Sequence, residues 1–63
     1  MPTIHVEMFA GRSDQQKEKM AERFTQVLVE EGGARPETVH VIFVDVAPSN
    51  WAVGGKLAGR KQD

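Results

Sequence analysis

The sequence predicts an α+β fold: a single β-α-β unit with parallel strands and a short C-terminal hairpin, assembled into an oligomer. Three patterns predict the unit: alternating polar and apolar residues near the N-terminus, an amphipathic helical segment, and an apolar run rich in β-branched residues. A strand, a helix and a strand in this order form a right-handed crossover with parallel strands. At 63 residues, the chain is expected to be a single domain over residues 1–63.

The first expected strand covers residues 2–9. Its side chains alternate with a period of two, which is typical of a strand with one buried face. The apolar side carries Ile4, Val6 and Met8, and the polar side carries Thr3, His5 and Glu7. His5 and Glu7 are therefore interpreted as strand-surface residues, and Phe9 places an aromatic ring near the end of the strand.

A helix is expected over about residues 14–31. Ser13, followed three residues later by Gln16, matches a capping box, and Gly32-Gly33 supplies the left-handed residue that ends many helices. Apolar residues at helical spacing form one stripe, and charged residues that are expected to be solvated form the opposite face. The two sets are Met20, Ala21, Phe24, Val27 and Leu28, and Lys17, Glu18, Glu22, Arg23 and Glu30.

The second expected strand, residues 39–46, is apolar on nearly every position, which is typical of a strand buried on both faces. One helix covers only one face of a sheet, and no further segment of this sequence is suited to cover the other. We therefore expect a second copy of the chain to do so. After this strand, Gly54-Gly55 between Ala52-Val53 and Lys56-Leu57 predicts a short hairpin.

Composition supports self-association and excludes other means of stabilising a small domain. The sequence has no cysteine, so it has no disulfides and no thiolate metal ligands, and two histidines are too few for a structural zinc site. No metal or cofactor is expected. Oligomerisation is the remaining device by which so short a chain gains stability.

The charge balance argues against nucleic acid and membranes as partners. The net charge is −1, with 27% charged residues, so no broad positive field would attract polyanions or anionic lipid surfaces. No apolar run is long enough to span a bilayer, and residues 1–12 do not form a signal peptide. A cytoplasmic location is therefore expected.

Three segments carry a resemblance to a known family: Met1-Pro2 leading into the first strand, Gly11-Arg12-Ser13-Asp14 followed by Gln16-Lys17, and Trp51-Ala52-Val53-Gly54-Gly55. Together they resemble the 4-oxalocrotonate (2-hydroxymuconate) tautomerase family over essentially the whole chain. The resemblance implies the tautomerase (MIF-like) fold and a homohexamer built as a trimer of dimers. It also implies keto-enol isomerisation of a small carboxylate, either a 2-hydroxymuconate-like dienoate or the enol of a 2-keto acid, without a cofactor.

By this resemblance Pro2 is the catalytic group. Removal of Met1 leaves Pro2 with a free secondary amine. An unperturbed α-amino group titrates at about 7.7–8.0, and an apolar pocket or a nearby cation lowers its pKa. Such an amine can accept a proton from one atom and return it to another. The alternative is that proline is simply a common second residue.

Arg12 resembles the arginine that binds the substrate carboxylate in this family. Pro2 begins the first strand and Arg12 follows its far end, so eight residues at roughly 3.3 Å each separate them by about 25 Å. Arg12 would therefore have to reach Pro2 of a neighbouring subunit. The alternative is a solvated loop arginine near the start of the helix.

His40 stands where family members that act on dicarboxylates carry a second arginine. Neutral imidazole offers one donor in place of a charged two-pronged fork, so we expect a substrate with one carboxylate, or weak activity on a dicarboxylate. An equally weighted alternative is that His40 only packs at a subunit interface.

Trp51 matches the aromatic residue that keeps the family's pocket apolar, although a single tryptophan is also common in cores and interfaces. Phe9 matches a position whose backbone amide can face the substrate. Related dehalogenases use a carboxylate near the aromatic segment, and here Ala52 and Val53 follow Trp51. Hydration and dehalogenation are therefore disfavoured.

Two other functions remain open at this point. One is a non-catalytic subunit that pairs with a proline-active homologue in a hetero-oligomer. The other is an interaction module in which Met1 stays on and the nitrogen of Pro2 remains an amide.

Overall fold

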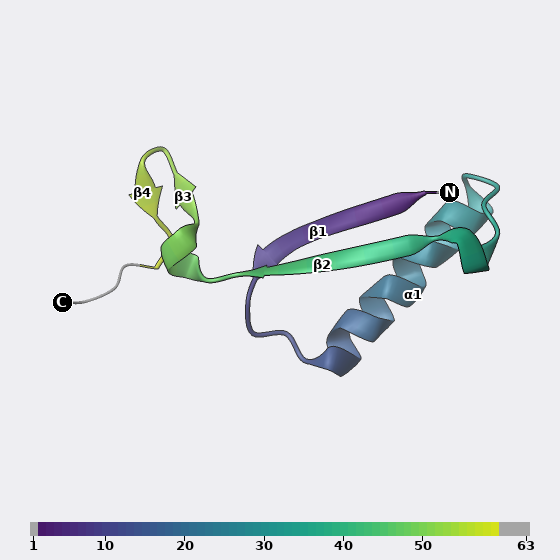
Figure 1. The fold of residues 1–63 in the computed structure, drawn as a ribbon, viewed down its shortest axis with the longest axis horizontal. Helices are drawn as coiled ribbons and strands as arrows, with labels where there is room; N and C mark the ends of the chain where they lie inside the picture. Colours follow the sequence, from purple (N-terminus) through teal and green to yellow (C-terminus); the bar gives the residue numbers. More distant parts are fainter. Residues whose placement is uncertain (1, 60–63) are drawn as a thin grey trace.

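The computed structural model describes residues 2–59 and has the predicted order of elements (Figure 1). Met1, whose removal the interpretation of Pro2 requires, lies outside the described residues. The elements are β1 (Thr3–Phe9), α1 (Asp14–Glu30), the 3-10 turn η1 (Pro36–Thr38), β2 (His40–Val46), the 3-10 turn η2 (Pro48–Asn50), β3 (Ala52–Val53) and β4 (Lys56–Leu57).

β1 and β2 form a two-stranded parallel sheet, as predicted. Thr3 lies opposite His40 and Phe9 opposite Val46, so the two strands run in register along their whole length. Because side chains alternate along a strand, each face of the sheet takes every second pair. We call one the helix-covered face, formed by Ile4, Val6, Met8, Val41, Phe43 and Asp45, and the other the uncovered face, formed by Thr3, His5, Glu7, Phe9, His40, Ile42, Val44 and Val46.

α1 begins with the predicted capping box. The Ser13 hydroxyl accepts a hydrogen bond from the backbone N–H of Gln16, and the side-chain oxygen of Gln16 accepts one from the backbone N–H of Ser13. The helix ends at Glu30, one residue before the expected end, and Gly33 then takes a left-handed conformation with φ +69°.

The phase of α1 on the sheet differs from the prediction at two residues. Lys17, expected in solvent, is half-buried against the sheet, and Val27, expected in the apolar stripe, is 55% exposed. The half-buried residues recur every three to four positions, as a helix resting on one surface requires. They are Lys17, Met20, Ala21, Phe24, Thr25, Leu28 and Val29.

The predicted hairpin is confirmed as β3 paired antiparallel with β4. Gly54 and Gly55 form its tip with φ +60° and +83°. Two successive positive φ angles are those of the tight turn that matches strand twist, and glycine adopts them without strain. The hairpin projects beyond the end of β2, away from α1 (Figure 1).

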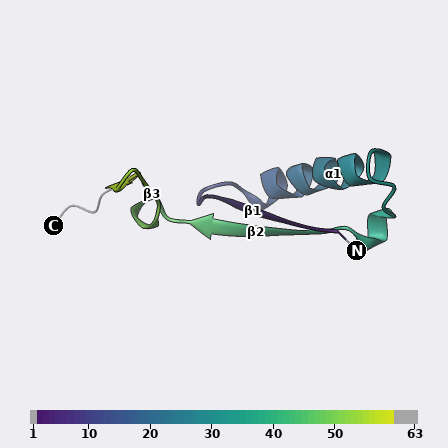
Figure 2. The same cartoon turned by 90° about the horizontal axis from the view of Figure 1, so that it is seen from above.

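No helix or strand of residues 2–59 covers the uncovered face of the sheet, as Figure 2 shows. Ile42 and Val44 are 43% and 38% exposed, so the expected burial of β2 on both faces is not met within one chain. Among residues 2–59, none is fully buried. The radius of gyration is 15.1 Å, whereas a compact domain of this length has about 11 Å.

Within residues 2–59, the structure contains no helix that is both long enough and apolar enough to cross a lipid bilayer.

Candidate active site

The carboxyl end of the sheet gathers three of the predicted site residues. The ring of Phe9, the last residue of β1, meets the indole of Trp51 edge to face, with centroids 4.9 Å apart and planes at 68°. Arg12 follows in the loop toward α1, and its Nη1 donates a hydrogen bond of 3.1 Å to the carbonyl oxygen of Phe9. Phe9, Arg12 and Trp51 therefore form one contiguous group.

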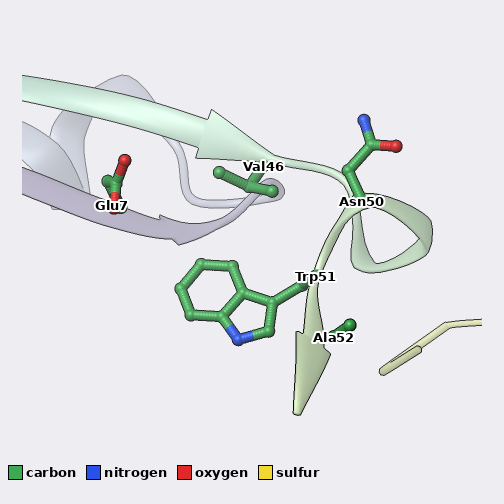
Figure 3. Close-up of a pocket in the computed structure, with 5 residues that line it drawn as sticks. All are labelled: Glu7, Val46, Asn50, Trp51 and Ala52. Atoms are coloured by element: carbon green, nitrogen blue, oxygen red, sulfur yellow. The ribbon is translucent and has the colours of Figure 1, made fainter. Parts of the chain in front are cut away.

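An open hollow of about 300 Å³ lies beside this group. Its lining comes from both strands and from the η2–β3 segment: Glu7, Val46, Asn50, Trp51 and Ala52. Figure 3 shows the indole extending from that segment back toward Glu7 and β1. The hollow thus combines an apolar wall with one carboxylate and one amide.

Glu7 and Asn50 are the polar lining residues that the sequence pattern does not assign to a site. The alternation along β1 predicts Glu7 only as a strand-surface residue, and the sequence next to Trp51 lacks a carboxylate. Glu7 is exposed on β1, as expected, and it also supplies a carboxylate to the hollow beside Trp51. The signal is its place two residues before Phe9, on the same face of the strand.

The amino end of the sheet holds the other two predicted site residues. The backbone N–H of His40 donates a 3.0 Å hydrogen bond to the carbonyl oxygen of Pro2, so the two residues lie at the start of neighbouring strands. Pro2 is half-buried, and the side chain of His40 is exposed on the uncovered face.

One chain does not bring the two groups together. Six residue steps separate Thr3 from Phe9, which is about 20 Å along a strand, and the segment after β2 lies at the end of the sheet opposite the N-terminus (Figure 1). The structure therefore places Pro2 with His40 and, far from them, Arg12 with Phe9 and Trp51.

On the helix-covered face, an ion pair joins α1 to the carboxyl end of β2. Nζ of Lys17 lies 2.7 Å from Oδ2 of Asp45. Asp45 therefore faces away from the hollow that its neighbour Val46 lines. Across residues 2–59, no three His, Cys, Asp or Glu side chains gather in a way that could hold a metal ion.

Comparisons of the sequence and of the structure with known proteins both find tautomerases. The family model of tautomerase enzymes matches residues 2–61. A 2-hydroxymuconate tautomerase of Comamonas testosteroni is 40% identical over 58 residues, which cover 92% of each chain. A probable tautomerase of Ralstonia nicotianae is 36% identical over 61 residues, which cover 97% of this chain and 94% of that one.

Among solved structures, one from a study of the 4-oxalocrotonate tautomerase isozymes of Methylibium petroleiphilum aligns with a TM-score of 0.84 at 37% identity. The alignment covers 90% of this chain and 92% of that one. Fold and relatives thus define a tautomerase, an isomerase that moves a proton within its substrate. Within the tautomerase superfamily, the chain belongs to the 4-oxalocrotonate tautomerase family.

Proposed function

We propose that this tautomerase converts the enol of a 2-keto acid, or a related 2-hydroxydienoate, into its keto form, with Pro2 as general acid and base. After removal of Met1, the neutral amine of Pro2 takes the proton of the enol hydroxyl. The electron pair of the O–H bond becomes the π bond of the carbonyl, and the π pair of the enol C=C bond (passed along the conjugated system in a dienoate) takes a proton from the ammonium to form the new C–H bond. The product is an isomer of the substrate, so no co-reactant is consumed.

The separation of the two groups of candidate residues carries this proposal. Pro2 offers a base at one end of the sheet, and Arg12 offers a cation that could hold an anionic substrate at the other end, about 20 Å or more away. A site that uses both must form between chains, with Arg12 of one subunit beside Pro2 of a neighbour. A guanidinium there would bind the carboxylate in a two-pronged contact and draw electrons from the adjacent carbonyl.

The uncovered face supports the oligomer that such a site requires. Ile42 and Val44 lie exposed at the centre of this face, and burying them against another chain would recover the hydrophobic free energy that one helix cannot supply. The hairpin adds two further exposed apolar residues, Val53 and Leu57. We propose a homohexamer, a trimer of dimers, in which these surfaces are buried.

The remaining candidates set the shape and polarity of the pocket. Trp51 would form its apolar wall, which keeps the amine of Pro2 weakly basic. The backbone N–H of Phe9 would face the substrate. His40 begins β2 beside Pro2 and offers imidazole where a second carboxylate would need an arginine. We therefore propose a substrate with one carboxylate, such as phenylenolpyruvate, over the dicarboxylate 2-hydroxymuconate.

A subunit-mixing experiment tests the shared site. P2A should be nearly inactive on phenylenolpyruvate at any concentration, and R12A should be nearly inactive at substrate concentrations far below its raised KM, where the mixing experiment is carried out. When they are dissociated together and reassociated, about a quarter of the sites should combine an intact Pro2 with an intact Arg12, because each comes from a different chain. Activity should rise to that fraction of the unmodified enzyme, while each variant taken alone through the same procedure stays inactive.

Intact-mass measurement belongs with the assay. It reports whether Met1 is absent, which the mechanism requires, and whether mixed oligomers have formed. Mixed oligomers without regained activity would overturn the shared site, and full activity of a chain that retains Met1 would overturn the role of Pro2.

A further inference from the structure

We infer that Lys17 and Asp45 are a positioning pair for Arg12: their ion pair fixes the first turn of α1 on the sheet and thereby sets where the guanidinium lies. This inference rests on the proposed role of Arg12 as the group that binds the substrate carboxylate. Neither Lys17 nor Asp45 touches the substrate in this scheme.

The pair joins two different elements close to the loop that carries Arg12. Lys17 is the fourth residue of α1, and Asp45 is the last but one residue of β2, opposite Met8. Nζ and Oδ2 are 2.7 Å apart, and the two side chains are 22% and 41% exposed. This distance is within the range of a charge-assisted hydrogen bond, so the two side chains are in direct contact.

Among residues Asp14 to Lys19, Lys17 is the one whose side chain lies against the sheet. Of the first six residues of α1, Asp14 to Lys19, Lys17 is the only one that is not exposed. The apolar packing of the helix begins at Met20, almost two turns from the N-terminus. The place of the first turn on the sheet therefore depends on the ion pair.

The loop Ala10–Ser13 transmits this placement to Arg12. At its start, the backbone N–H of Ala10 donates a 3.0 Å hydrogen bond to the carbonyl oxygen of Val46. At its end, the capping box ties Ser13 to Gln16 within α1.

The loop thus ties the end of β2 to the N-terminus of α1 through backbone hydrogen bonds, and the ion pair joins the same two elements through side chains on the helix-covered face. Gly11, with φ +128°, gives the loop no side chain that could hold it by packing. If the pair is broken, the helix start can move, and Arg12 moves with it.

The experiment measures kcat and KM of the oligomer on phenylenolpyruvate for K17M and D45N. Lys17→Met keeps the apolar stem and removes the charge, and Asp45→Asn keeps the shape. We expect KM to rise about tenfold, because a displaced guanidinium loses part of its charge-assisted hydrogen bonding to the carboxylate. We expect kcat to fall by less than KM rises, because the main contact that is weakened is the one to the carboxylate, which is present in the substrate and the transition state alike.

Three comparisons separate positioning from a merely structural role. K17R should restore KM. The double variant K17M/D45N should be no worse than K17M, because the two residues act as one unit. K19M removes an exposed lysine two residues further along α1 and should leave KM unchanged.

The R12A background distinguishes a failure of this inference from a failure of the proposed function. If R12A leaves KM unchanged, Arg12 does not bind the carboxylate. If R12A raises KM but K17M and D45N do not, the positioning role is wrong. If K17M raises KM equally with and without Arg12, the ion pair acts by another route, and the inference is also wrong.

Discussion

Phe9 and Trp51 meet edge to face across the carboxyl end of the sheet, with their centroids 4.9 Å apart. Phe9 ends β1 and Trp51 precedes β3, so this contact joins the first strand to the C-terminal hairpin. The carbonyl of Phe9 also receives the hydrogen bond from Arg12. One aromatic pair thus links the wall of the hollow to the loop of the proposed carboxylate-binding group.

The free energy of this contact should appear as a coupling between the two residues. Phe9→Leu and Trp51→Leu should each destabilise the protein, and either change alone abolishes the aromatic pair. The double variant should therefore lose about 0.5–1.5 kcal/mol less unfolding free energy than the two single losses added together. Denaturant unfolding at fixed protein concentration measures it. The matched cycle of Trp51→Leu with Val27→Ala, on the outer side of α1, should be additive, and additivity in both cycles would contradict the coupling.

Placing a charge on the uncovered face should dissociate the oligomer. Val44→Lys puts an ammonium where we expect another chain to pack, and a buried unpaired charge is costly. Sedimentation should show smaller species, with lost activity and a lower Tm. Val27→Lys is the matched control, since that valine is 55% exposed on the helix. An unchanged assembly in Val44→Lys would mean that the face stays in solvent.

Arginine at position 40 should shift the substrate preference toward dicarboxylates. His40→Arg adds a permanent charge and a second donor beside Pro2, which favours a second carboxylate. We expect kcat/KM on 2-hydroxymuconate to rise about tenfold relative to phenylenolpyruvate, equivalent to about 1.4 kcal/mol. His40→Gln, which is neutral and of similar size, serves as the control. An unchanged ratio in His40→Arg would indicate that His40 serves only packing.

Loss of the helix cap should destabilise the subunit. Ser13→Ala removes the hydroxyl that accepts from the N–H of Gln16, and such substitutions cost about 1 kcal/mol. Thermal unfolding at constant protein concentration measures the change. Ser49→Ala, in η2, provides a serine outside any helix cap for comparison. Equal stability of Ser13→Ala and the unmodified protein would show that the cap is dispensable.

Short-range signals in the sequence predict the elements well. The capping box at Ser13 and the two glycines at 54 and 55 each specify a local geometry that depends on few other residues. The first strand follows from hydrophobic periodicity and the second from an apolar run rich in β-branched residues. Their parallel pairing follows from the order of the elements. None of these inferences needs knowledge of a partner chain.

The rotation of α1 on the sheet is harder to predict, because it depends on contacts between elements. The charge of Lys17 predicts a residue in solvent. Its position predicts otherwise, because Lys17 lies three residues before Met20 and four before Ala21 and therefore shares their face of the helix. The feature of the sequence that points to a partner for Lys17 is Asp45, the only acidic residue of β2. The hydrophobicity of Val27 predicts a place in the stripe, although the residue lies to one side of it.

The candidate site is predictable only partially, for a different reason. The roles of Pro2, Arg12, His40, Trp51 and Phe9 come from family resemblance, and they stay predictions. Glu7 escapes sequence reasoning because strand pairing, and not sequence distance, brings it to the hollow beside Trp51.

A chain that encloses none of its residues from 2 to 59 has an unusual dependence on dilution. If the contacts that close its interior are made between molecules, the equilibrium between folded and unfolded states includes the protein concentration. Each tenfold dilution would then lower the free energy of unfolding by about 1.4 kcal/mol for every association step lost. The melting temperature of this protein is therefore expected to fall on dilution, as that of a self-contained domain does not.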